Sequence, residues 1–195
     1  MKRLLITSVT GLLLSTSVAV ADSNPHYISL GYVNSEIDYA GSDLSGSGIA
    51  LNGSLALNSG LSLLGGYERI DYDSDLESKE YSFGAGYRFE LASGFTLVAH
   101  YKHLKTELDG DRKTDSSANQ LGGEVAFMLP DSVVSFGKKR TLQAYFNQTR
   151  YSNDDISEGG AAFRVYLTDS FSVGVSYSMD NDDRSDFQLF IREDG

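Results

Sequence analysis

Residues 80–91 read Glu-Tyr-Ser-Phe-Gly-Ala-Gly-Tyr-Arg-Phe-Glu-Leu. Apolar side chains occupy every second position of this stretch, and the positions between them hold glycine, serine or a charged residue. Because successive side chains of a β-strand point to opposite faces, this alternation predicts a strand with one apolar face and one polar face. An amphipathic helix would instead repeat its apolar positions about every 3.6 residues.

The same alternation recurs along most of the chain. We predict strands at 27–39, 47–58, 61–72, 80–91, 95–106, 119–129, 141–151, 159–167, 171–180 and 185–193. A tilted strand needs about 9–11 residues to cross a bilayer, and most of the predicted strands are at least that long. The fold class is therefore predicted as all-β, an antiparallel up-and-down transmembrane β-barrel of ten strands. Eight strands, with one hairpin outside the barrel, is the alternative.

Two kinds of connection alternate between these strands. Tight turns follow the second, fourth and eighth strands, as at 58–60 and 92–94, and a longer turn follows the sixth. The links after the odd-numbered strands are mostly longer and acidic, as at 71–75 and 180–183. Short turns at one end and longer polar loops at the other are typical of outer-membrane barrels.

The polar faces of the strands favour a lumen over a water-exposed surface. Gly, Ser, Ala and Asn dominate these faces, whereas a soluble barrel would present more Lys, Glu and Thr to water. Long charged side chains are isolated among them, and in a narrow lumen they must pair to offset desolvation. We predict a lumen charge network of Glu68, Arg88, Glu90, Lys102, Glu124, Arg164 and Arg192. A soluble secreted β-barrel or sandwich is the alternative.

The first 21 residues have the features of an export signal. A short basic start is followed by an apolar stretch diluted with small residues, which ends in Ala19-Val20-Ala21. This small-x-small ending fits cleavage by a signal peptidase. We therefore predict a signal peptide over 1–21, cleaved after Ala21, and an outer-membrane barrel domain over 22–195.

Several of these segments resemble a known class of protein. The start at 26–32, the hairpin at 48–63 and the glycine-containing runs at 81–87 and 171–177 resemble the small outer-membrane β-barrels of Gram-negative bacteria, such as opacity-type porins and OmpA-like transmembrane domains. The resemblance covers essentially the whole predicted mature chain, and it implies a fold and a location in the bacterial outer membrane. Such barrels commonly end on an aromatic residue, whereas this chain continues for five residues beyond Phe190.

Negative charge is concentrated at one end of the predicted barrel. The chain has 27 Asp and Glu, 16 Lys and Arg and a formal net charge of −11, which argues against a nucleic-acid partner. Hard divalent cations favour clustered carboxylates, so loosely bound divalent cations are one interpretation of the acidic links. The candidate ligands are Asp71, Asp73, Asp75, Asp109, Asp111, Asp154, Asp155, Asp180, Asp182 and Asp183. A hydrated acidic surface without bound metal is the interpretation we favour, and no other cofactor is expected.

The sequence gives no catalytic constellation. His100 shares the lumen-facing parity of the fifth predicted strand with Lys102, and His103 has the opposite parity. Because Ser and Asp are abundant, a histidine near one of them has little meaning. We therefore expect a non-enzymatic barrel with a structural, envelope-integrity or surface-interaction role. A narrow porin or small-ligand channel and a lipid- or peptide-acting barrel enzyme are alternatives. The expected partners of this monomer are outer-membrane lipids and lipopolysaccharide.

Overall fold

The computed structural model of the chain describes residues 26–39, 42–57, 60–73, 76–92, 94–110, 113–130, 137–152 and 154–195. The predicted signal peptide lies outside these residues. The described part contains no helix long and apolar enough to cross a membrane. Its strands are β1 (Tyr27–Tyr39), β2 (Ser42–Ala56), β3 (Leu61–Tyr72), β4 (Leu76–Ala92), β5 (Phe95–Asp109), β6 (Thr114–Met128), β7 (Arg140–Arg150), β8 (Asp155–Tyr166), β9 (Phe171–Asp180) and β10 (Arg184–Asp194).

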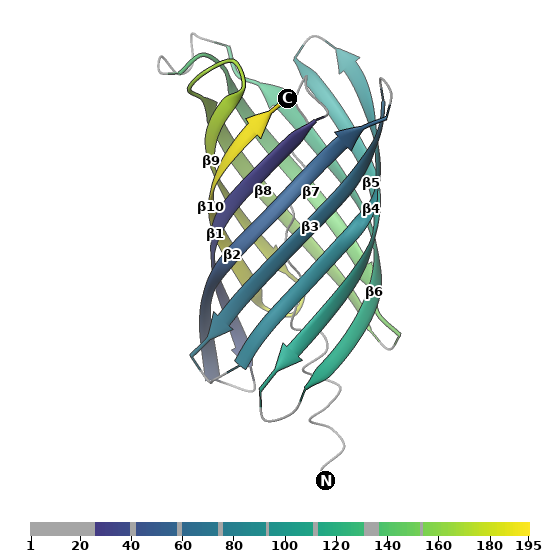
Figure 1. Ribbon diagram of the computed structural model, residues 1–195, viewed down its shortest axis with the longest axis vertical. Helices are drawn as coiled ribbons and strands as arrows, with labels where there is room; N and C mark the ends of the chain where they lie inside the picture. Colours follow the sequence, from purple (N-terminus) through teal and green to yellow (C-terminus); the bar gives the residue numbers. More distant parts are fainter. Residues whose placement is uncertain are drawn as a thin grey trace.

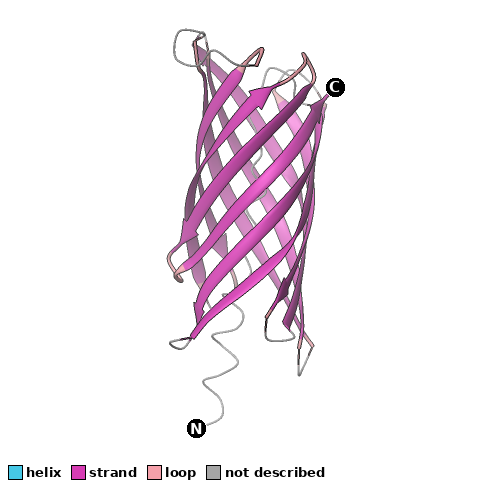
Figure 2. Cartoon of the chain, turned by 90° about the vertical axis from the view of Figure 1, so that its left-hand side faces the viewer, coloured by secondary structure: helices cyan, strands magenta, loops and turns pink. Residues whose placement is uncertain are grey.

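The ten strands form one closed antiparallel barrel. Each strand pairs with the next along the chain, and β1 pairs with β10 to close the sheet (Figure 1). The closing register runs from Tyr27 opposite Asp194 to Ile37 opposite Arg184. We call the end of the barrel that holds Tyr27 and Asp194 the terminal end, and the opposite end the loop end. Figure 2 shows that the strands tilt strongly against the long axis of the barrel. The predicted ten-stranded barrel is confirmed, and no edge is left with unpaired backbone groups.

The two faces of the barrel wall differ sharply in polarity. Large apolar side chains point outward, and Phe83 and Leu121 are 66% and 62% exposed. Charged side chains point inward, and Arg164 and Arg192 are 0% and 1% exposed. A soluble protein has the opposite arrangement, because it keeps its charged groups in water. The outward apolar band is the surface that a transmembrane barrel presents to lipid.

The connections correct the sequence analysis. The strands that leave the loop end begin earlier than predicted: β4 begins at Leu76 and β6 at Thr114. As a result, the links after the odd-numbered strands have only two to four residues, and the longest link, of eleven residues, joins β6 to β7 at the terminal end. The prediction that these links are longer than the turns at the other end is therefore wrong. Beyond the apolar band the outward positions become polar, as at Glu77 and Lys79 of β4, so the outward apolar pattern ends although the backbone pairing continues.

The last strand continues past its final aromatic residue. β10 stays paired with β1 as far as Asp194, and Phe190 points into the lumen with an exposed fraction of 7%. The ring of Phe190 lies where a side chain on Gly174 of β9 would project. Glycine at position 174 thus gives room for an inward aromatic ring on the neighbouring strand, a packing known from other β-sheets.

Candidate functional site in the lumen and at the outer rim

Arginines line the lumen near the terminal end. They are Arg88, Arg164 and Arg192, whereas Arg140 has the outward parity of β7 and donates to the carbonyl oxygen of Gly137 at 3.0 Å. Arg192 bonds to Asp194 through Nε at 2.6 Å and Nη2 at 2.5 Å, and its guanidinium lies 3.7 Å from the centroid of the Tyr27 ring. The hydroxyl of Tyr166 donates to the same Asp194 carboxylate at 2.9 Å, and Arg164 lies over the Tyr166 ring at 4.7 Å. These contacts link β8, β10 and β1 across the closing seam of the barrel.

Carboxylates line the half of the lumen nearer the loop end. They are Glu68, Glu80, Glu158 and Asp186, and each is 7% exposed or less. Glu68 and Glu80 stand directly opposite each other on β3 and β4, an arrangement that charge repulsion disfavours. Arg184 offsets this repulsion, because it bonds to Asp186 at 2.7 Å and reaches Glu68 at 3.7 Å. The contact between Arg184 and Glu68 joins β10 to β3 on the lumen side of β1 and β2, which lie between them in the sheet.

The lumen charges are therefore polarised along the barrel axis. Three arginines, Arg88, Arg164 and Arg192, face two carboxylates, Glu124 and Asp194, toward the terminal end. Toward the loop end, four carboxylates face Arg184 and Lys102. Lys102 lies between the two levels, within electrostatic reach of Glu80 and Glu124. The lumen therefore has an excess of negative charge toward the loop end and an excess of positive charge toward the terminal end.

A chain of hydrogen bonds runs along the wall between these levels. Nε2 of His100 donates to Oδ1 of Asn147 at 3.1 Å, and Nδ2 of Asn147 donates to Oε2 of Glu158 at 3.1 Å. His100 and Asn147 sit on β5 and β7, on either side of Gly122 in β6. A Cβ atom on Gly122 would collide with both polar atoms of the first bond. Glycine at position 122 is what allows β5 and β7 to be bonded across β6.

Gly122→Ala is expected to lower the free energy of unfolding by about 1–3 kcal/mol, because it separates His100 from Asn147 inside the barrel. The measurement is urea unfolding of the refolded protein in lipid vesicles. Gly123→Ala is the matched control, since a Cβ at this neighbouring outward position meets no atom closer than 3.7 Å. Equal losses of stability in the two variants would contradict the bridging role of Gly122.

An apolar collar lines the lumen at the loop end. We define it by the inward residues of two clusters: Val33, Ile37, Ala50, Ile70, Tyr72 and Leu108 in one, and Leu104, Ala118, Tyr151 and Ile156 in the other. Together the two clusters draw on β1, β2, β3, β5, β6 and β8, and on Tyr151 in the link after β7. The sequence analysis did not identify this collar, because it assigned inward positions to polar side chains. Hydrophobic constrictions of this kind can block water and ions by dewetting.

The structure places the predicted lumen residues in two groups. Glu68, Lys102, Glu124, Arg164 and Arg192 are buried inside the barrel, and the side chain of Arg88 is 12% exposed. Glu90 lies at the rim of the terminal end, where its side chain is 79% exposed and bonds to Arg88 at 3.4 Å. The predicted set thus divides between the terminal arginines and the carboxylate level, with Glu90 outside the lumen.

Sequence reasoning missed Glu80, Glu158, Arg184, Asp186 and Asp194 as lumen residues. Three of them, Glu158, Arg184 and Asp186, fall in segments that were taken as acidic links or strand ends. The parity of each strand was the signal that could have found them. Arg184, Asp186 and Asp194 share the inward parity of Arg192 along β10, and Glu158 shares that of Arg164 along β8.

The acidic candidates for cation binding are mostly engaged with other protein groups. Asp71, Asp109 and Asp155 bond to Arg69, Lys113 and Arg150 at 3.1, 2.7 and 3.1 Å. Oδ1 of Asp180 accepts from the backbone nitrogens of Asp182 and Arg184, and Oδ1 of Asp154 accepts from that of Asp155. Asp75 and Asp111 lie outside the described residues. Among the residues that are described, no three acidic or histidine side chains come together in a way that could hold a metal ion.

The turn between β9 and β10 is crowded with negative charge. Desolvation, reinforced by the neighbouring carboxylates of Asp180, Asp154 and Asp183, raises the pKa of Asp182. Asp183 has a φ angle of 60°, in the left-handed region that aspartate tolerates in tight turns. The crowding indicates that these carboxylates are held together by the turn geometry at a cost in electrostatic repulsion.

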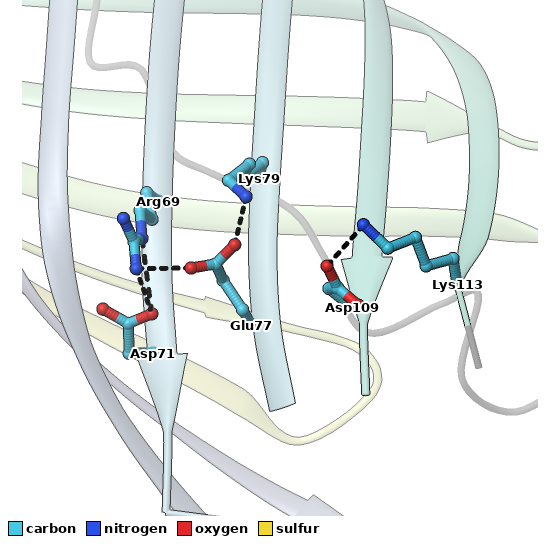
Figure 3. Close-up of polar contacts among 6 residues, drawn as sticks. All are labelled: Arg69, Asp71, Glu77, Lys79, Asp109 and Lys113. Carbon is cyan, nitrogen blue, oxygen red and sulfur yellow. Dashed lines mark hydrogen bonds and ion pairs between the residues drawn. The ribbon is translucent and has the colours of Figure 1, made fainter. Parts of the chain in front are cut away.

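Outward-facing ion pairs form a charged rim at the loop end of β3, β4 and β5 (Figure 3). Glu77 bonds to both Arg69 and Lys79, and Arg69 also bonds to Asp71 at 3.1 Å. On β5, Lys105 bonds to Glu107 at 2.5 Å. These side chains follow the outward parity of the apolar positions below them, so the rim continues the outer surface of the barrel toward the loop end.

Comparisons with known proteins place the fold. No protein-family model matches the sequence, and the search of curated proteins gave no match. The β-domain of the Bordetella autotransporter BrkA is 13% identical, with 88% of this chain and 99% of that chain covered and a TM-score of 0.58. The COG4313 outer-membrane channel of Pseudomonas putida F1 is 11% identical, with 93% and 99% covered and a TM-score of 0.50. The KdgM porin is 12% identical, with 86% and 99% covered and a TM-score of 0.49.

At these identities the likeness concerns the fold. The closed ten-stranded sheet, the outward apolar band and the charged lumen define the class of the protein, and the likeness to the BrkA β-domain and the COG4313 channel agrees with it. It is a small transmembrane β-barrel of the outer-membrane type.

Proposed function

We propose that the protein is a non-enzymatic β-barrel of the bacterial outer membrane with a structural role in the envelope, and that its lumen is closed to ions at rest. The observation that carries this proposal is the apolar collar in the loop half of the lumen, whose members lie beside bonded charges, as Ala50 and Ile37 stand opposite Glu68 and Arg184. An open porin would be expected to present polar side chains at its mouth. A collar of isoleucine, leucine and tyrosine side chains instead opposes the passage of hydrated ions.

The contacts of the lumen histidine support a structural role. A catalytic histidine is usually oriented by a carboxylate and faces a nucleophile or a substrate. In this barrel, Nε2 of His100 is engaged with the amide of Asn147, which also bonds to Glu158. The hydrogen bonds thus connect β5, β7 and β8, and the histidine is part of the wall.

The proposal predicts three results with the wild-type protein. It should fractionate with the outer membrane, shift its mobility on a gel after boiling, and show no conductance steps in a planar bilayer. Recovery as a soluble protein without a heat shift would overturn the membrane location. Frequent conductance steps with the wild-type protein would overturn the closed lumen while leaving the location intact.

A narrow channel is the second candidate function, and the polarised lumen favours it. Many of the lumen hydrogen bonds connect neighbouring strands along the wall, as Gln143 to Glu124 at 2.7 Å and Gln120 to Thr149 at 3.1 Å do. A passage lined by both signs of charge would suit small solutes that carry both signs. Constitutive conductance of the wild-type protein distinguishes this function from the closed barrel.

A further inference from the structure

On β3 and β4 the charged rim is ordered in two rows of like charge. Arg69 stands directly opposite Lys79 in the register of β3 and β4. Just beyond this pair toward the loop end, Asp71 stands opposite Glu77, and Glu77 stands opposite Asp109 of β5. A basic row therefore lies nearer the apolar band, and an acidic row lies farther from it. On β5, Glu107 stands opposite Lys79, and Lys105 stands two residues nearer the apolar band, opposite Tyr81.

This order needs an explanation, because like charges directly opposite each other destabilise a sheet. Facing residues of opposite charge would avoid this repulsion, so the fold itself does not require like charges at these positions. The diagonal ion pairs between the rows recover part of the energy, and Figure 3 shows Glu77 placed between Arg69 and Lys79. Exposed pairs of this kind contribute little to stability, and the side chains of Arg69 and Lys105 are still 44% and 49% exposed. Their donor groups can therefore reach a ligand outside the barrel.

An aromatic layer lies between the basic row and the apolar band. Two residues below Arg69 and Lys79 on the same face, Tyr67 and Tyr81 stand opposite each other with ring centroids 5.3 Å apart. On β5 the hydroxyl of Tyr101 donates to Oδ1 of Asn119 at 2.9 Å. Tyrosines gather where a barrel wall meets the lipid headgroups. The basic row is thus at the headgroup level of the leaflet on the loop side.

Below the tyrosine layer, the outward face of β3 has no side chain at one position. This position is Gly65, which stands opposite Phe83 of β4. A Cβ at Gly65 would meet no atom closer than 3.9 Å, so packing within the protein does not require glycine there. The missing side chain leaves room for a lipid chain against the wall beneath the tyrosine layer, four residues from Arg69 on the same face.

We propose that Arg69, Lys79 and Lys105 bind the phosphate groups of a lipopolysaccharide molecule in the outer leaflet, with an acyl chain lying over Gly65. Guanidinium and ammonium donors form strong charge-assisted bonds with phosphate oxygens, and arginine can bind them in a bidentate manner. The phosphate oxygens would replace the carboxylates of the acidic row as partners of these donor groups. The carboxylates would then turn toward water. The inference rests on the proposed location in the outer membrane, with the loop end of the barrel on the side of the outer leaflet.

The test uses the protein refolded from denaturant into detergent micelles free of lipopolysaccharide. The probe is bisphosphorylated lipid A, and its binding is measured by titration with and without a chelator of divalent cations. Substituting Arg69→Gln, Lys79→Gln and Lys105→Gln together is expected to weaken binding at least about 10-fold, as the loss of several charge-assisted bonds requires. Arg150→Gln is the matched control, because it removes an exposed outward arginine from β7, where it bonds to Asp155 at 3.1 Å.

Each outcome of this test decides for or against the site. Weaker binding by the triple variant, normal binding by the Arg150 variant and weak binding of dephosphorylated lipid A support it. Unchanged binding by the triple variant, or equal binding of the dephosphorylated lipid, overturns it. Loss of binding on chelation alone would assign the phosphates to cations bridged by the acidic row, and would also overturn it. A heat-modifiability gel on every variant confirms that the barrel is folded. Failure of the outer-membrane location would be seen separately, by cell fractionation.

Discussion

Arg192→Leu is expected to lower the free energy of unfolding by about 3–5 kcal/mol, the usual result of removing one partner of a buried ion pair. Arg192 is 1% exposed, and it holds Asp194 of its own strand and the ring of Tyr27 on β1. Without the guanidinium, the Asp194 carboxylate stays buried with the Tyr166 hydroxyl as a remaining donor. The effect falls on the seam where the first and last strands meet, so the barrel should open there first.

The measurement is the urea midpoint of the barrel in lipid vesicles, together with the temperature at which the folded band disappears from a gel. Arg192→Leu combined with Asp194→Leu should lose less stability than the single change, since the double variant leaves no buried carboxylate behind. Arg192→Lys should fall between wild type and leucine, because lysine keeps the charge but not the two-pronged contact. A double variant less stable than the single variant would show that the pair is not the source of the effect.

The strand count and the direction of each face could be predicted from the sequence, because both depend on a local signal. In β1, β3 and β9 the alternation gave the strand limits as the structure has them, from Tyr27 to Tyr39, from Leu61 to Tyr72 and from Phe171 to Asp180. In these strands the apolar alternation ends where the backbone pairing ends. The predicted limits fail where mostly polar residues extend the strand, as over 76–79 in β4 and 114–118 in β6.

The candidate site depends on contacts that no local pattern reports. Glu68 and Arg184 are separated by more than one hundred residues, and only the closure of β1 onto β10 brings them within 3.7 Å. The bridge from His100 to Asn147 depends on the register that places Gly122 between them. Inward apolar residues such as Ile70 were also hidden, because a lumen was expected to be polar. The sequence therefore identified the wall of the barrel, and the closure of the sheet determined which wall residues meet.

Opening the collar is the second large effect that we expect. Ile37, Ile70 and Leu108 belong to one of its clusters and are 2%, 1% and 4% exposed. Changing all three to serine should let water wet the loop end of the lumen, because hydroxyl groups replace the apolar lining. We expect conductance steps in a planar bilayer that are absent from the wild-type protein. Ile37→Val, Ile70→Val and Leu108→Ile together form the control, which keeps the lining apolar and should remain closed.

The polarised lumen should also make that current depend on the sign of the applied voltage. An opened passage with excess carboxylate toward the loop end and excess arginine toward the terminal end concentrates ions under one sign of voltage and depletes them under the other. The current through the serine variant should therefore differ between the two polarities by about 2-fold or more, as an asymmetric fixed field requires. Adding Glu68→Gln and Glu158→Gln, which reduce the charge of the acidic level, should make the current more symmetric. A symmetric current before that change would mean that the fixed lumen charges do not control ion passage, and that the collar alone keeps the barrel closed.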